Sequence, residues 1–168
     1  MLSEELMFRR RALMAQKQGE IAYEAWNLSF DGTNYIDTGV YLFTQENINR
    51  DFEFIAEGIY GAKNTSKTAL CTKHDGNAYG FLVRCGTSTD TTYKGTIWVL
   101  NNTPQTKVIV KRINGVLQLS GDYITNPGVG FINNVFAWSL HLGCAVDNSG
   151  NPYRYWTGTI DHIVVRWL

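Results

Sequence analysis

Apolar and polar residues alternate in short runs along most of the chain, as they do in β-strands whose two faces meet different surroundings. The last run, residues 156–168, is the most informative. Apolar residues occupy alternate positions up to 160 and, after a slip of one position, alternate again from 163 to 167. Such a slip predicts a bulge or bend that turns the second half of the strand toward the same core.

Further runs of this kind predict strands at 35–40, 52–57, 79–85, 96–100 and 135–146, the last of them either buried on both faces for part of its length or bent. The clearest hairpin joins 107–113 to 116–120 through Asn114-Gly115. This pair fits a type I′ turn because both residues tolerate positive φ angles. Many short strands without a second helical pattern predict an all-β fold, a sandwich or barrel, and we expect an antiparallel two-sheet sandwich.

The first residues differ from everything that follows. Residues 3–18 are rich in helix formers and contain no β-branched residue, which predicts a short N-terminal α-helix. We therefore divide the chain into a helical anchor over 1–20 and a sandwich domain over 21–168. A helix of this length is marginal alone in water, so it should pack against its own sandwich, a copy of itself or a partner.

Apolar and basic side chains would make that contact: Met7, Phe8, Arg9, Arg10, Arg11, Leu13 and Met14. The apolar members would dock while the arginines pair with acidic groups of a larger assembly. The alternative is a solvated helix face on which the arginines pair with Glu4 and Glu5.

Charge and composition narrow the classes of function. The chain has 168 residues, enough for one domain with a full core, and its fifteen basic residues balance fifteen acidic ones. This balance argues against nucleic-acid binding through phosphates. No stretch is long enough to span a membrane, and no signal peptide is apparent. Three widely spaced cysteines, Cys71, Cys85 and Cys144, argue against a disulfide framework or a zinc site.

Two motifs carry a resemblance to a known family. Residues 30–39 read Phe-Asp-Gly-Thr-Asn-Tyr-Ile-Asp-Thr-Gly and resemble the first strand pair of concanavalin A-like, laminin G-like jelly rolls. Leu140-His141-Leu142-Gly143, followed by Trp156-x-Gly158-x-Ile160-Asp161-x-Ile163-x-Val165-x-Trp167, resembles the closing motif of that superfamily. The resemblance implies a jelly-roll sandwich but no single activity, because lectins, adhesion modules, hydrolases and structural units share this fold.

The opening of the chain is also similar to small bacteriophage and prophage virion proteins, through its basic helix and the Asp-Gly-Thr-Asn-Tyr-Ile-Asp-Thr-Gly strand. This similarity implies a non-enzymatic structural, decoration or fibre module of a virion, made in the bacterial host cytoplasm. Its partners would be other virion proteins or copies of itself, and its sandwich would face host glycans. A nucleic acid or a membrane is not expected as a partner.

Sugar binding uses exposed aromatic rings beside amides and carboxylates. Tyr153 and Tyr155 follow the polar loop 147–152 and offer this combination, whereas Trp156 is in phase with Ile160 and should lie in the core. The glycan-binding candidates are therefore Tyr153, Tyr155, Trp98, Tyr93, Asp147 and Asn148. A free-standing carbohydrate-binding lectin is the alternative to the virion module.

Asp147, Asn148 and Asn151 carry the oxygen atoms that calcium prefers, although a plain turn is the simpler interpretation. No other cofactor is expected. Glycoside hydrolysis needs two facing carboxylates, and the nearest candidates, Glu53 and Glu57, are interrupted by Ile55. We therefore predict no catalytic residue, with a glycoside hydrolase as the least favoured alternative.

Overall fold

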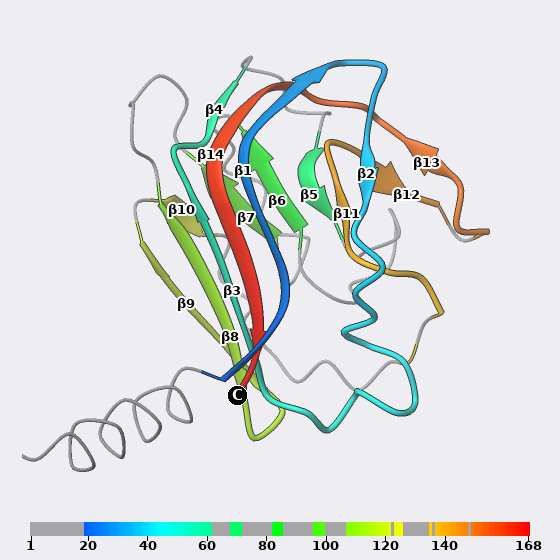
Figure 1. Cartoon of the computed structure of the whole chain (residues 1–168), viewed down its shortest axis with the longest axis vertical. Helices are drawn as coiled ribbons and strands as arrows, with labels where there is room; N and C mark the ends of the chain where they lie inside the picture. Colours follow the sequence, from blue (N-terminus) through cyan, green and yellow to red (C-terminus); the bar gives the residue numbers. More distant parts are fainter. Residues whose placement is uncertain are drawn as a thin grey trace, which may run out of the picture.

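The computed structural model describes residues 19–61, 68–71, 82–85, 96–99, 107–121, 123–125, 135, 137–147 and 149–168. This part of the chain is all-β, and its strands form two six-stranded sheets and a two-stranded ribbon (Figure 1). The helix predicted near the N-terminus and its seven partner-binding side chains lie outside the described residues, so the division of the chain near residue 20 stays a prediction. Within the described part, no helix is long and apolar enough to cross a bilayer.

The first sheet contains the longest strands, and every pairing in it is antiparallel. In Figure 1 the blue strand β1 runs beside the red strand β14, so the two ends of the described chain meet in this sheet. The strand order is β1 (Glu20–Asp31), β14 (Thr157–Trp167), β3 (Phe52–Glu57), β8 (Val108–Ile113) and β9 (Val116–Gly121), with β4 (Tyr60–Gly61) also paired to β14.

The second sheet is built from shorter strands and departs from the prediction at one point. Strands β6 and β7 run parallel, so the sandwich is antiparallel except for this pair. Its order is β10 (Tyr123–Thr125), β7 (Thr96–Val99), β6 (Leu82–Cys85), β5 (Thr68–Cys71), β11 (His141–Leu142) and β2 (Ile36–Asp37). The ribbon joins β12 (Ala145–Val146) to β13 (Pro152–Tyr153).

One core lies between the two sheets. Phe54 and Ile163 of the first sheet and Val83 and Leu142 of the second belong to the same buried cluster. Trp156 is fully buried in it, as its phase with Ile160 predicts. Because side chains from both sheets share one interior, the two-layer sandwich is confirmed.

The hairpin prediction is also confirmed. Strands β8 and β9 meet at Asn114 and Gly115, whose φ angles are 50° and 78°. Positive φ at both central residues is the requirement of a type I′ turn, which matches the twist of the paired strands.

The run 135–146 does not form one continuous strand, and the chain bends within it, which was one of the two alternatives. Its second half contains two short strands, β11 and β12, separated by Gly143 with a φ of 82°. A Cβ at Gly143 would lie 2.2 Å from Cδ1 of Phe30, so the turn has room only for a glycine at this position. Residues 139–146 are buried throughout, and this burial explains the apolar run that suggested a strand. The strand expected at 35–40 is likewise reduced to β2.

The slip predicted in the last strand is present and extends to its neighbours. Ile160 and Ile163 are both fully buried, while Asp161 between them is exposed. Opposite this point in β1 lies Asn27, with a φ of 53°. On the other side, Gly58 separates β3 from β4, and a Cβ there would lie 2.1 Å from Oδ2 of Asp161. Three adjacent strands therefore change phase at one level of the sheet.

A buried arginine fixes the loop that precedes β3. Arg112 of β8 is fully buried, in phase with Val108 and Val110 on the core face. Its Nε donates to the carbonyl of Arg50 at 2.9 Å, and its Nη2 donates to the carbonyls of Asn47 at 2.7 Å and Leu42 at 3.2 Å. One side chain thus donates to three backbone carbonyls, of which that of Asn47 also accepts a hydrogen bond from the backbone nitrogen of Arg50 at 2.9 Å.

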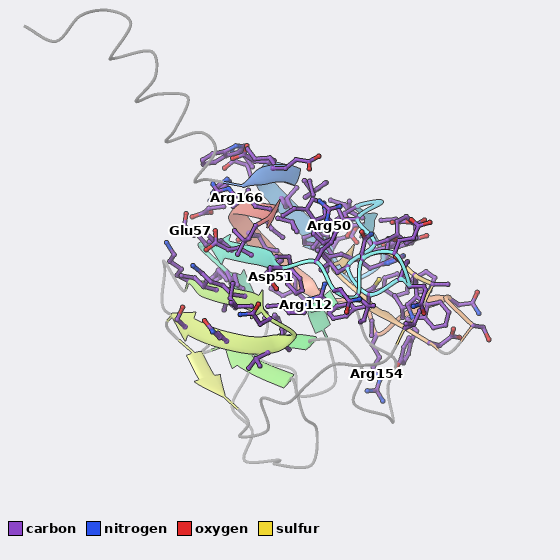
Figure 2. All side chains as sticks on the ribbon, turned by 90° about the horizontal axis from the view of Figure 1, so that it is seen from below. Arg50, Asp51, Glu57, Arg112, Arg154 and Arg166 are labelled. Carbon is purple, nitrogen blue, oxygen red and sulfur yellow. The ribbon has the colours of Figure 1, made fainter. Side chains whose placement is uncertain are left out.

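The same guanidinium lies against two aromatic rings, with its central carbon 5.2 Å from the ring centroid of Phe43 and 4.9 Å from that of Phe52. Burial lowers the pKa of Arg112 to about 10, although the nearby carboxylate of Asp51 acts in the opposite direction. Figure 2 shows Arg112 close to Arg50 and Asp51 at one end of the sandwich.

Candidate ligand-binding rim

The predicted aromatic candidates have different positions in the fold. Tyr155 follows β13, and its ring lies 6.1 Å from that of Tyr35 at an angle of 48°. Tyr153 lies in β13 itself, half-buried, with the guanidinium of Arg154 at 5.3 Å from its ring. Trp98 lies in β7 of the second sheet. Tyr93 and Asn148 fall outside the described residues.

Tyr155 therefore belongs to a group of side chains at the β2 edge of the second sheet, which we call the rim site: Tyr35, Asp37, Ser139, His141 and Tyr155. The rings of Tyr35 and His141 are stacked, with centroids 5.6 Å apart and planes at 20°. Tyr35 is 42% exposed, whereas His141 is 6% exposed. The tyrosine therefore forms the accessible surface of this group and the imidazole supports it.

Strand pairing brings the two halves of the rim site together. In the register of β2 and β11, His141 lies opposite Asp37. The pairing continues beyond the strands, because Thr38 donates to the carbonyl of Leu140 from its backbone nitrogen at 3.1 Å and from Oγ1 at 2.8 Å. Leu140 in turn donates to the carbonyl of Val40 at 2.8 Å. Residues about a hundred positions apart are thus held in fixed register.

A tight turn over residues 31–34 positions Tyr35 at the β2 edge of the second sheet. Oδ1 of Asp31 accepts hydrogen bonds from the backbone nitrogens of Thr33 at 2.8 Å and Asn34 at 3.1 Å, and from Oγ1 of Thr33 at 2.7 Å. The hydrogen bonds from Thr33 are the main cause of the lowered pKa of Asp31. Asn34 closes the turn by donating from Nδ2 to the carbonyl of Ser29 at 3.1 Å. This Asx-type turn fixes where β2 begins.

The polar groups of the rim site are held by short contacts. Oδ1 of Asp37 accepts hydrogen bonds from Oγ of Ser139 and from the backbone nitrogen of Gly39, the latter at 2.9 Å. Partial burial alone would raise the pKa of Asp37, but these hydrogen bonds and the nearby His141 outweigh it and lower the pKa. A carboxylate with a lowered pKa is ionised at neutral pH.

The imidazole has a defined role in this group. Nδ1 of His141 lies 3.0 Å from the carbonyl oxygen of Ser139, and because a carbonyl can only accept, Nδ1 carries the proton and donates. The hydroxyl of Ser139 donates to Asp37 instead of to the imidazole. This arrangement differs from a nucleophile triad, in which the histidine accepts the serine proton. The rim site therefore offers an aromatic face, an ionised carboxylate and a buried imidazole that supports the exposed ring, which suit binding.

The loop 147–152 forms a capped turn. Oδ1 of Asp147 accepts hydrogen bonds from the backbone nitrogens of Ser149 and Asn151, both at 2.8 Å, and its Oδ2 accepts from Nδ2 of Asn151 at 3.2 Å. Both carboxylate oxygens thus serve the turn, as Asp does in such loops. Among the described residues, no group of three or more His, Cys, Asp or Glu side chains is placed to hold a metal ion. Calcium binding by Asp147, Asn148 and Asn151 stays a prediction.

The two carboxylates considered for hydrolysis do not face each other across a cleft. Glu53 and Glu57 lie in β3, and four residues at a rise of about 3.3 Å each place them about 13 Å apart along the strand. Glycosidases use carboxyl separations of about 5 to 9.5 Å. Both are also engaged by cations. Glu53 contacts Lys111 at 2.7 Å and Arg166 at 3.3 Å, and Glu57 contacts Lys107 at 2.5 Å.

Comparisons with known proteins support the fold and identify no family. No protein-family model and no curated protein sequence matches the chain. The fold is similar to that of the K499G mutant of NanB sialidase from Streptococcus pneumoniae, with a TM-score of 0.51 and 10% identity over 87% of this chain and 26% of that chain. A NanB structure in complex with 2-[(3-chlorobenzyl)ammonio]ethanesulfonate gives a TM-score of 0.49 and 9% identity, with the same coverage.

This chain therefore spans about a quarter of the length of the sialidase that it resembles, since 26% of that chain is covered. Likeness at 10% identity defines the fold alone. With the sheet order and the shared core, it places this protein in the class of antiparallel β-sandwich domains.

Sequence reasoning missed most of the rim site, although the signal was present. Tyr35, Asp37 and His141 lie inside the two motifs that indicated the fold, at positions that alternate with buried or half-buried Ile36, Leu140 and Leu142. Their alternation places them on the outer face of the second sheet. Examination of these motifs for outward-facing residues would have found them, whereas Ser139 carries no such signal.

Proposed function

We propose that this protein is a non-catalytic glycan-binding module that contacts a sugar residue through the rim site. The observation that carries the proposal is the exposed ring of Tyr35, stacked on His141 beside the ionised carboxylate of Asp37. The C–H face of a sugar packs against an aromatic ring, while its hydroxyls donate to a carboxylate. Hydrogen bonds from Ser139 and Gly39 hold that carboxylate in place, which reduces the ordering cost of binding.

The likeness to part of a sialidase supports the scaffold of this proposal, a β-sandwich, and nothing about the ligand. The separation and ion pairing of Glu53 and Glu57 favour binding over hydrolysis, since these carboxylates lie too far apart to act together on one glycosidic bond.

A glycan-array screen of the full chain, followed by calorimetry with the best ligand, tests the binding function. Tyr35→Ala should weaken binding about tenfold, because truncation of an aromatic anchor in a binding site commonly costs more than 1 kcal/mol. Asp37→Asn should weaken it as well. Tyr60→Ala is the matched control, since this tyrosine is 53% exposed on β4 of the other sheet. Equal affinity in Tyr35→Ala and the native chain, or no binding on the array, would overturn the proposal.

The proposed setting of this module is a bacteriophage virion, where the N-terminal segment attaches the sandwich to other virion proteins or to copies of itself. This part rests on the resemblance of the opening sequence. Native mass measurements on the full chain and on a chain starting at Ile21 test it. We expect a multimer that is lost on truncation. Equal monomeric masses would instead favour the alternative, a free-standing carbohydrate-binding lectin.

A further inference from the structure

A groove lies beside the start of β1, between that strand, the loop after β2 and the end of β14. Its volume is about 350 Å³, within the range of about 300 to 1,000 Å³ that small-molecule sites occupy. Its apolar walls include Ile21, Tyr41 and Trp167, and its polar groups are Glu20, Asn47 and Arg50. The lining thus combines apolar side chains with charged and polar ones that can orient a ligand.

The positive centre of the groove is Arg50. Its guanidinium carbon lies 4.1 Å from the ring centroid of Trp167, which is almost fully buried, so the indole supports the cation from one side. The counter-charge is Glu20, with Nη2 and Oε2 separated by 3.6 Å and side-chain exposures of 46% and 76%. An exposed pair with one long contact contributes between about 0 and 1 kcal/mol. A carboxylate that binds the guanidinium through two oxygens would therefore displace Glu20.

The loop that contains Arg50 is ordered in the absence of a ligand. The buried Arg112 donates to the backbone carbonyls of Arg50 and Asn47 from inside the core. Asn47 in turn donates from Nδ2 to the carbonyl of Tyr41 at 2.7 Å. The loop is thus ordered on folding, and a ligand need not order it on binding.

We propose that this groove binds a carboxylate attached to a small ring, with the carboxylate on the guanidinium of Arg50 and the ring against Ile21 and Tyr41. Ile21 is 54% exposed and Tyr41 is 44% exposed, so both present surface to a ligand. Acidic sugars and simple cyclic organic acids share this chemistry. The groove involves no rim-site residue, so this proposal does not depend on the proposed function.

NMR titration of the full chain tests the proposal, with the indole N–H of Trp167 and the amides of 20–22, 40 and 41 as reporters. Galacturonate and cyclohexanecarboxylate are the acidic probes, and galactose and cyclohexylmethanol are their neutral counterparts. We expect saturable shifts at these reporters with at least one acid and none with the neutral probes. Binding of galacturonate alone would identify an acidic sugar, and binding of cyclohexanecarboxylate alone a simple organic acid.

Two variants give opposite expected results. Arg50→Gln should weaken binding of the acid at least tenfold, because the carboxylate loses its partner. Glu20→Gln should strengthen it by up to about fivefold, since it removes a competing carboxylate worth up to about 1 kcal/mol. Arg154→Gln, which changes an exposed arginine beside Tyr153 and outside the groove, is the control and should leave the affinity unchanged. Absence of shifts with both acids, equal shifts with neutral probes, or weaker binding in Glu20→Gln would overturn the proposal.

Discussion

The indole ring of Trp26 lies almost parallel to the imidazole of His162, with ring centroids 3.7 Å apart and planes at 17°. Trp26 is 64% exposed, so the imidazole supports a large apolar ring at the surface of the first sheet. Nε2 of His162 lies 2.9 Å from Oε1 of Glu24, and Nδ1 lies 3.5 Å from Oε2 of Glu57. His162 of β14 therefore links β1 to β3 through its contacts with Glu24 and Glu57.

We expect His162→Ala to lower the free energy of unfolding by about 1–2 kcal/mol, because it removes two polar contacts and a ring stack. Urea denaturation measures this change. Thr159→Ala, at an exposed position of the same strand, is the control and should stay within about 0.5 kcal/mol of the native protein. A double-mutant cycle with Trp26→Ala should give a coupling of about 0.5–1.5 kcal/mol. Strict additivity would show that the stacked rings do not stabilise each other.

Arg112→Met should destabilise the fold by about 2–4 kcal/mol, because the carbonyls of Leu42 and Arg50 lose the guanidinium that donates to them. Denaturant titration followed by aromatic fluorescence measures this loss. Arg166→Met changes an arginine at the partly exposed outer face, where we expect a cost of less than about 1 kcal/mol. Equal stability of the two variants would mean that the loop before β3 does not need the guanidinium.

Gly143→Ala and Gly39→Ala separate steric overlap from backbone strain. Both glycines have positive φ, 82° and 68°, but a Cβ at Gly143 would meet Phe30 at 2.2 Å, whereas a Cβ at Gly39 meets nothing within 4 Å. Gly39→Ala should therefore cost only the left-handed strain, about 1–2 kcal/mol, and Gly143→Ala should cost a further 1–3 kcal/mol, roughly, for overpacking. Thermal unfolding of both variants tests this difference, and equal losses would contradict the overlap.

The acid stability of the protein should depend in part on Asp37. Its pKa is lowered in the folded state, so the unfolded chain binds a proton more readily at this position. The stabilisation is complete above the ordinary pKa of 3.8 and is lost as the pH falls through the lower folded-state pKa. Below about pH 4, the Tm of the native protein should fall more steeply than that of Asp37→Asn. Parallel Tm curves would exclude this contribution.

Local rules were sufficient where a few adjacent residues determine the structure. Asn114-Gly115 indicated the hairpin because the turn type depends on these two residues alone. The slip in the last strand was visible because alternation fails between Ile160 and Ile163. The buried position of Trp156 followed from the same phase.

The features that the sequence does not predict depend on contacts between residues far apart in the chain. The ring of Phe30, more than a hundred residues earlier in the chain, leaves no room for a side chain at Gly143, and the local sequence does not predict this contact. Arg112 occupies a core position although its charge predicts exposure, because its acceptors come from a loop some sixty residues away. The rim site likewise required the register of His141 against Asp37, whereas Tyr155 could be proposed from its neighbours alone.

The common level at which β1, β14 and β3 change phase has a consequence for folding fidelity. A shift of β1 by one residue would move Asn27 away from the irregularity around Asp161 and demand a left-handed conformation from Trp26 or Leu28. A shift of β3 would bring a side chain to the point where Gly58 now admits Asp161. Misaligned pairings therefore meet a steric penalty at the sheet centre, so the native alignment is selected by shape as well as by hydrophobicity.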